Sequence, residues 1–176
     1  MVTKITREVH INAPKEKVWE ILTDFGNVSL YSPGVLKSYL TSDQQRGVGT
    51  TRHCDLATLG LIKNATLEER IIAWDEGESL EIEIYGGTKT PPFKKAVGAY
   101  SLREDNGGTL VSFTVEYSLK FGPVGYLMDK LMFATQSGKA FTSTLASLKH
   151  YAEADQPVEG AGGQNFESVA DLALSK

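Results

Sequence analysis

Apolar residues follow two different spacings in the first part of this chain. Between residues 3 and 11, Ile5, Val9 and Ile11 stand in alternate register with polar residues between them, which predicts a β-strand. Residues 12–27 then change to helical spacing, with apolar positions at i, i+3, i+4 and i+7, namely Val18, Ile21, Leu22 and Phe25. Pro14 suits the first turn of this helix, and a short second turn is expected before the break at residues 32–34.

The pattern from residue 35 to residue 119 is typical of a region rich in strands. Candidate strands cover residues 35–42, 49–56, 63–75, 79–86, 94–104 and 109–121. Turn-forming sequences such as DEGES and EDNGG separate them, and connections this short favour antiparallel pairing. The alternation is clearest in the last strand, where one face carries Val111, Phe113, Val115, Tyr117 and Leu119. We therefore expect a sheet with one buried face and one solvated face.

Residues 120–151 return to helical spacing and predict one long helix. The stripe along this helix is Val124, Leu127, Leu131, Thr135, Gly138, Thr142, Leu145 and Leu148. A glycine inside a helix costs roughly 1 kcal/mol relative to alanine, so its presence needs an explanation. Gly138 indicates either close packing of a strand against the helix or space left for a ligand, and the pattern supports both interpretations.

In chain order, these elements are a strand, one or two short helices, about six strands and a long helix. Helices gathered on one side of an antiparallel sheet make an α+β fold, and a curled sheet of six or seven strands would hold the long helix in its concave face. We assign residues 1–154 to this domain. Residues 155–176 begin with DQPVEGAGGQ and are predicted to be a glycine-rich linker with a short helical or disordered tail.

Five segments occur in an order that carries a resemblance to a known superfamily. They are INAPKEKVWEILTD, GVGTTRHCDL, LEERIIAWDEGESLEIEI, GAYSLREDNGGTLVSFTVEYSL and GPVGYLMDKL…LASLKHY. Over residues 3–153 the chain resembles the START-like helix-grip superfamily (SRPBCC), in particular its polyketide cyclase/dehydrase and lipid-transport branch. The resemblance implies a curved antiparallel sheet that wraps around a long C-terminal helix, with a hydrophobic tunnel between them.

The resemblance implies less about activity than about fold. Members of the superfamily bind lipids, sterols, polyketides, quinones or plant hormones; some transform the ligand, and many only carry it. A shared fold does not settle function, which has to be argued from the site. The resemblance therefore implies a small hydrophobic ligand and no cofactor, and it assigns no catalytic residue to this chain.

Composition and charge narrow the expected partners and location. Hydrophobic residues make up 41% and charged residues 23%, and the formal net charge is -4 with a pI of about 5.4. This balance argues against nucleic acid or an anionic membrane as a partner, although a local basic patch would escape a whole-chain count. No apolar run approaches the roughly 18 residues of a membrane span. We expect a cytoplasmic protein without stable membrane insertion, and its oligomeric state is open.

One local hypothesis concerns a predicted hairpin with its turn at residues 60–61. This turn pairs Arg52 with Glu69 and Cys54 with Leu67, and side-chain parity places all four on the concave face. A buried ion pair is costly unless it is well hydrogen-bonded. The pair would either orient a polar group of a ligand or form an ion pair with no ligand role, and a one-residue bulge would turn both side chains outward.

Catalytic motifs are hard to find in this chain. His53 is next to the single cysteine, Cys54, but neighbours in a strand point to opposite faces and cannot form a nucleophile pair. The three histidines are scattered, and no G-x-S-x-G, HExxH or phosphate-binding glycine loop occurs. The pattern favours a binder or carrier. The alternatives are a cyclase/dehydratase-type enzyme without metal or nucleotide, and a ligand-free protein-interaction module.

The expected cavity lining combines strand parity with the geometry that the resemblance implies. The candidate ligand-binding residues are Tyr31, Arg52, Cys54, Leu67, Glu69, Ile84, Phe93, Tyr100, Phe113, Val115, Tyr117, Leu131 and Thr135. The proline- and glycine-containing loop at residues 86–93 is the expected entrance, with Phe93 as a gate. A pocket of several hundred Å³ would favour a binder or enzyme over an interaction module.

Overall fold

A computed structural model describes residues 2–58, 62–120 and 134–158. Its strands are β1 (Thr3–Ile11), β2 (Val35–Leu40), β3 (Thr51–Leu56), β4 (Thr66–Asp75), β5 (Ser79–Thr88), β6 (Phe93–Asp105) and β7 (Gly108–Leu119). Its helices are α1 (Lys15–Thr23), the 3-10 helix η1 (Phe25–Leu30) and α3 (Ala134–Ala154). The predicted order of elements is confirmed for all of these segments.

The strands form one seven-stranded antiparallel sheet in the order β1-β7-β6-β5-β4-β3-β2. Every pair of neighbouring strands except β1–β7 is consecutive in the chain, so most neighbouring strands are joined by a direct link. The turn between β6 and β7 places Asn106 and Gly107 at φ values of 46° and 82°, which suits a tight hairpin. The pairing of β1 with β7 then brings the first strand beside the last.

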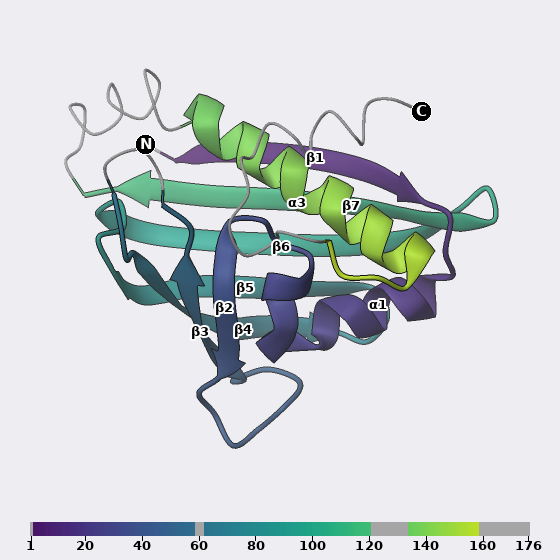
Figure 1. Ribbon diagram of the computed structural model, residues 1–176, viewed down its shortest axis with the longest axis horizontal. Helices are drawn as coiled ribbons and strands as arrows, with labels where there is room; N and C mark the ends of the chain where they lie inside the picture. Colours follow the sequence, from purple (N-terminus) through teal and green to yellow (C-terminus); the bar gives the residue numbers. More distant parts are fainter. Residues whose placement is uncertain (1, 59–61, 121–133, 159–176) are drawn as a thin grey trace.

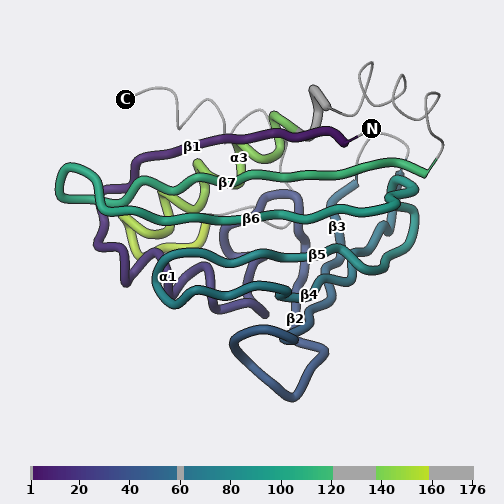
Figure 2. Tube along the Cα trace, turned by 180° about the vertical axis from the view of Figure 1, so that it is seen from behind, coloured from purple at the N-terminus to yellow at the C-terminus, as the bar shows by residue number. Residues whose placement is uncertain are grey.

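The helices cover one face of the sheet. Figure 1 shows α3 running obliquely across the strands, with α1 on the same side, and the strand direction turning strongly between β7 and β2. Figure 2, seen from behind, shows that no helix of the described residues lies over the other face. The predicted α+β helix-grip arrangement is therefore confirmed, and the concave face of the sheet is the one that α3 and α1 cover.

The buried core fills the space under α1 and the second half of α3. Leu22 of α1, Ile71 of β4, Val111 of β7, and Leu145 and Leu148 of α3 are each at most 2% exposed. A second, smaller apolar cluster lies further along the sheet and consists of Ile5, Ala96, Val115 and Tyr117. Residues of both clusters also line the cavity described below.

The long helix extends beyond its predicted C-terminal end, and the first part of the prediction lies outside the described residues. Its described part begins at Ala134 and continues to Ala154, beyond the predicted end at residue 151. Residues 121–133 and 159–176, which include Leu131 and most of the predicted tail, lie outside the described residues. The division of the chain at residue 154 therefore stays a prediction. The cytoplasmic location is a separate prediction that also stays untested. Within the described residues, no helix is long and apolar enough to span a membrane.

Gly138 is explained by packing against a strand. A Cβ atom built on Gly138 would lie 2.7 Å from Nη2 of Arg7, a side chain of β1, and Gly138 does not line the cavity. Of the two interpretations of this glycine, the structure supports packing, here against the end of a side chain from β1. The glycine lets the Arg7 guanidinium lie directly against the surface of α3.

Candidate functional site

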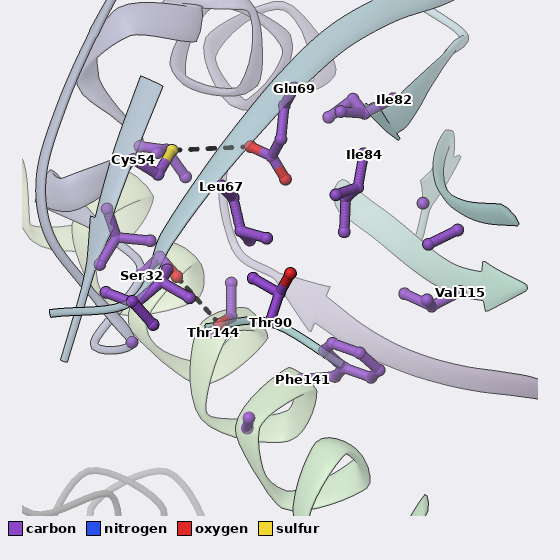
Figure 3. A pocket seen from close by; sticks show the side chains of 18 of the residues that line it. Ser32, Cys54, Leu67, Glu69, Ile82, Ile84, Thr90, Val115, Phe141 and Thr144 are labelled. Atoms are coloured by element: carbon purple, nitrogen blue, oxygen red, sulfur yellow. Dashed lines mark hydrogen bonds between the residues drawn. The ribbon is translucent and has the colours of Figure 1, made fainter. Parts of the chain in front are cut away.

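A cavity of about 330 Å³ lies between the concave face of the sheet and α3. Figure 3 shows side chains from several strands and from α3 converging on this space, among them Leu67, Ile84 and Val115 from the sheet and Phe141 from the helix. The sheet contributes these residues because alternate side chains of each strand point to the same face. The cavity is thus a product of strand parity on one side and of the orientation of α3 on the other.

Most of the cavity wall is apolar, and its aromatic rings contact one another. The Tyr100 and Phe113 rings are stacked with centroids 4.1 Å apart and planes at 17°. Phe113 also meets Phe141 of α3 edge to face, with centroids 5.3 Å apart at 87°. Phe93 packs on Tyr117 in a similar edge contact at 5.8 Å. These contacts fix the rings that connect the sheet to the helix.

Charged and polar side chains gather at one part of the cavity. Nε of Arg52 donates to Oε2 of Glu69 at 2.6 Å, and the two side chains are only 6% and 13% exposed. Nη1 of Arg52 donates to the backbone oxygen of Phe25 at 3.1 Å, and the guanidinium lies 4.0 Å from the centre of the Phe25 ring. The Cys54 thiol donates to the same Glu69 oxygen at 3.6 Å. Several partners therefore hold this buried ion pair, which is what a stable one requires.

Burial dominates the titration of this cluster. It raises the pKa of the Cys54 thiol to about 12, and the nearby Glu69 carboxylate adds to the effect. Burial also raises the pKa of Tyr31 to about 12 and that of Tyr100 well above its usual value. For Arg52, burial is the largest single influence and works to lower the pKa, but the Glu69 carboxylate together with Cys54 and Tyr31 raises it overall. At neutral pH the cluster therefore holds one internally neutralised ion pair, a neutral thiol and neutral phenols.

The predicted register of the β3–β4 hairpin is confirmed. Arg52 pairs with Glu69 and Cys54 with Leu67, and all four side chains line the cavity. A bulge does occur nearby, but it lies between β4 and β5, where Glu69 faces Ile84 while the preceding residue faces Gly86. The extra residue is on β5, so the parity of the β3–β4 pair is unchanged.

Most of the predicted lining residues do line the cavity. Those that do are Arg52, Cys54, Leu67, Glu69, Ile84, Phe93, Tyr100, Phe113, Val115 and Tyr117. Tyr31 is not among them: it is 2% exposed and lies beside a separate surface pocket with Lys17 and Tyr151. Thr135 is part of α3, although its side chain is not described, and Leu131 lies outside the described residues. A ligand-binding role for any of these residues stays a prediction.

The sequence patterns missed many lining residues, and among them all of those that the described part of α3 contributes. The helix contributes Ala140, Phe141 and Thr144, whereas the predicted stripe ran through Gly138 and Thr142. The predicted stripe is nevertheless buried at Gly138, Leu145 and Leu148, so the residues that line the cavity lie beside that stripe. A signal was present, because Phe141 is a large apolar residue flanked by small ones. Thr144 also contacts the segment before β2, where its hydroxyl lies 3.3 Å from that of Ser32, as Figure 3 shows.

Loop residues also contribute to the lining. Ile62 comes from the link between β3 and β4, and Lys89, Thr90 and Pro91 come from the link between β5 and β6. The predicted entrance loop at residues 86–93 therefore borders the cavity. Its function as the route of entry stays a prediction.

The outer face of the same hairpin carries a second polar cluster. His53 contacts Glu68 through Nδ1 at 2.5 Å and Asp55 through Nε2 at 3.2 Å, and its ring stacks on Tyr39 with centroids 5.1 Å apart. The hydrogen bond with Glu68 is the main reason that the pKa of His53 is raised. His53 does not line the cavity that Cys54 lines, as the strand parity predicts. Among the described residues, no group of three or more His, Cys, Asp or Glu side chains could hold a metal ion.

Comparison with known proteins agrees with this architecture. The model of a family described as polyketide cyclase / dehydrase and lipid transport matches residues 2–153. The chain belongs to this family. The resemblance to the START-like helix-grip superfamily is thereby confirmed. No curated protein matches the sequence significantly.

Several crystal structures share the fold of this family member. TTHA0849 from Thermus thermophilus superposes with a TM-score of 0.71 at 21% identity, covering 87% of this chain and 99% of its own. Ara h 8.0201 has a TM-score of 0.64 at 17% identity, with 86% and 98% covered. Ginseng major latex-like protein 151 from Panax ginseng has a TM-score of 0.63 at 18% identity, with 88% and 97% covered. At these identities the likeness shows the fold alone.

Proposed function

We propose that the protein binds and carries a small, largely apolar molecule in the cavity between the sheet and α3. The cavity itself is the observation that supports this function. Its volume of about 330 Å³ is within the roughly 300–1,000 Å³ of small-molecule sites, and such sites combine apolar walls with few polar groups. The family description, which includes lipid transport, points the same way. A ligand-free interaction module would have no need of this space.

The polar part of the cavity indicates the chemistry of the ligand. Arg52 and Glu69 neutralise each other, so an incoming carboxylate would add an uncompensated negative charge beside Glu69. The Tyr100 hydroxyl makes no hydrogen bond within the part of the chain that the structure describes. We therefore infer a ligand with an apolar body and a neutral oxygen, such as a hydroxyl or carbonyl group, that accepts a hydrogen bond from Tyr100 or from the Arg52 guanidinium.

The same residues are poorly suited to catalysis at neutral pH. A cyclase or dehydratase would need a group that readily gives or takes a proton, with a pKa near the working pH. Burial raises the pKa values of both Tyr100 and Cys54 away from that range. The thiol is thus a weak nucleophile and the phenol a weak acid. This favours binding over the alternative of an enzyme that transforms the ligand in the same cavity.

A matched pair of substitutions tests the binding function. Ala140 lines the cavity from α3, whereas Ala99 of β6 does not line it. We expect the neutral apolar dye N-phenyl-1-naphthylamine to fluoresce on binding the original protein and Ala99→Phe, and to bind Ala140→Phe at least tenfold more weakly. Native mass spectrometry of the freshly purified protein, followed by extraction under denaturing conditions, should release a bound molecule from the first two proteins only. Equal dye binding by all three proteins would show that the cavity is not the binding site.

A further inference from the structure

The strands end in two sets of loops, and only one set borders the cavity. It includes the described parts of link 57–65, link 89–92 with the first three residues of β6, and the end of β7 at residues 119–120. We refer to this set as the mouth end. Two hydrogen bonds join these segments. Nζ of Lys89 donates to the backbone oxygen of Lys63 at 2.9 Å. The backbone N–H of Lys120 donates to the backbone oxygen of Pro92 at 3.0 Å. The mouth end is therefore one continuous surface.

Positive charge is concentrated at the mouth end. Segments 57–65, 89–95 and 119–120 contain no Asp or Glu, and their charged residues are Lys63, Lys89, Lys94, Lys95 and Lys120. All five lysines are exposed. Within the described residues, none of the five forms an ion pair. Together with the hydrogen bond from Lys4, Lys95 helps to lower the pKa of the nearby Glu116 carboxyl, and the charges of the other four are available to attract an anionic partner.

The opposite end of the sheet has the opposite charge. Its loops, at residues 41–50, 75–79 and 104–107, contain one basic residue, Arg46. Their acidic residues are Asp43, Asp75, Glu76, Glu78, Glu104 and Asp105. The net charge of -4 therefore conceals two ends of opposite sign. This is the kind of local basic patch that a whole-chain count does not detect.

Exposed apolar side chains accompany the lysines. Ile62 borders the cavity and is 43% exposed. Leu36, also 43% exposed, is the second residue of β2, whose start pairs with the end of β3. Val2, at the start of the strand that pairs with the end of β7, is 67% exposed. A surface with both lysines and exposed apolar side chains suits the boundary between lipid headgroups and acyl chains.

We propose that the mouth end docks on the surface of an anionic lipid bilayer. The lysines would lie over the phosphate groups, and Ile62 and Leu36 would contact the interface. The absence of arginine among these charges fits a diffuse lipid surface, because lysine is a mobile point charge and does not require paired acceptors. In this orientation the cavity faces the bilayer, so an apolar molecule can pass between them without crossing water.

Two charge reversals on the same strand test this orientation. Lys94 and Arg103 are exposed residues near opposite ends of β6, so Lys94→Glu and Arg103→Glu change the net charge equally. Binding is measured by co-sedimentation with vesicles of phosphatidylcholine alone and of equal parts phosphatidylcholine and phosphatidylglycerol. We expect the original protein to bind only the anionic vesicles, and Lys94→Glu to weaken this binding about 25-fold, or roughly fivefold for each unit of charge.

The other results distinguish this surface from a general charge effect. Arg103→Glu should bind the anionic vesicles nearly as well as the original protein, and high salt should release all bound protein. Failure of the original protein to bind anionic vesicles would overturn the proposal, as would an equal loss for both variants. Dye binding in the cavity should be unchanged in both variants, which separates this surface from the proposed ligand site.

Discussion

The inner and outer faces of the β3–β4 pair carry similar charged residues in very different surroundings. On the inner face, Arg52 and Glu69 are 6% and 13% exposed and contribute to the cavity wall. On the outer face, His53 contacts Glu68 and Asp55, which are 29% and 44% exposed. The two clusters lie on neighbouring positions of the same strands, and the alternation of side chains directs them to opposite faces.

The contrast shows how burial changes the contribution of an ion pair to the stability of the fold. Water can take the place of either partner on the outer face, so the free energy of that cluster is small and depends on pH. On the inner face both side chains are largely removed from solvent, so a single unpaired charge is strongly unfavourable. A substitution in the inner pair is therefore expected to change the stability of the fold as well as the binding of any ligand that the pair contacts.

The largest expected effect is on the inner face. Arg52→Leu leaves the Glu69 carboxylate buried without its partner, and should lower the free energy of unfolding by about 3–5 kcal/mol in urea titrations. The double variant Arg52→Leu/Glu69→Leu removes both charges and should recover most of this loss. A double variant no more stable than the single one would mean that the ion pair itself is needed for folding.

The reactivity of Cys54 is the next test of the comparison. It is the only cysteine in the chain, and burial raises its pKa to about 12. Its reaction with a disulfide reagent at neutral pH should be about a thousandfold slower than that of a free thiol, because the thiolate is the reacting form. The control moves the thiol to the outer face with Cys54→Ser/Asp55→Cys, and should react like an exposed thiol. Equal rates in the two proteins would contradict the difference in burial.

The smallest effect is expected on the outer face, and it depends on pH. The pKa of His53 is raised in the folded protein, mainly by the Glu68 carboxylate, so the protonated form stabilises the fold. This contribution is complete below the unfolded pKa of about 6.5 and is lost as the pH rises through the folded value. His53→Asn should therefore cost about 1 kcal/mol in mildly acidic solution and less above neutral pH. Thermal unfolding of the original protein and of His53→Asn, in mildly acidic solution and above neutral pH, measures this difference in stability. A stability difference that is the same in both solutions would exclude the titration of His53 as its cause.

Much of the inner face could be predicted from the sequence. Side chains alternate along a strand because of local covalent geometry, so Arg52 and Cys54 had to share a face once β3 was recognised. The turn at residues 60–61 then set the pairing with Glu69 and Leu67. Tyr31 could not be placed in this way, because it lies after η1, where no strand parity applies. The bulge at β5 was also not predicted, although it left the cavity residues in place.

What the sequence by itself determined was the order of the elements and the direction of side chains within each strand, because both depend on neighbours in the chain. The tertiary structure decided which side of α3 faces the cavity, since a helix can rotate about its axis until packing selects one face. It placed Phe141 in the cavity and Gly138 against Arg7. It also gathered the lysines at the mouth end, because antiparallel pairing brings together loops that are far apart in the chain.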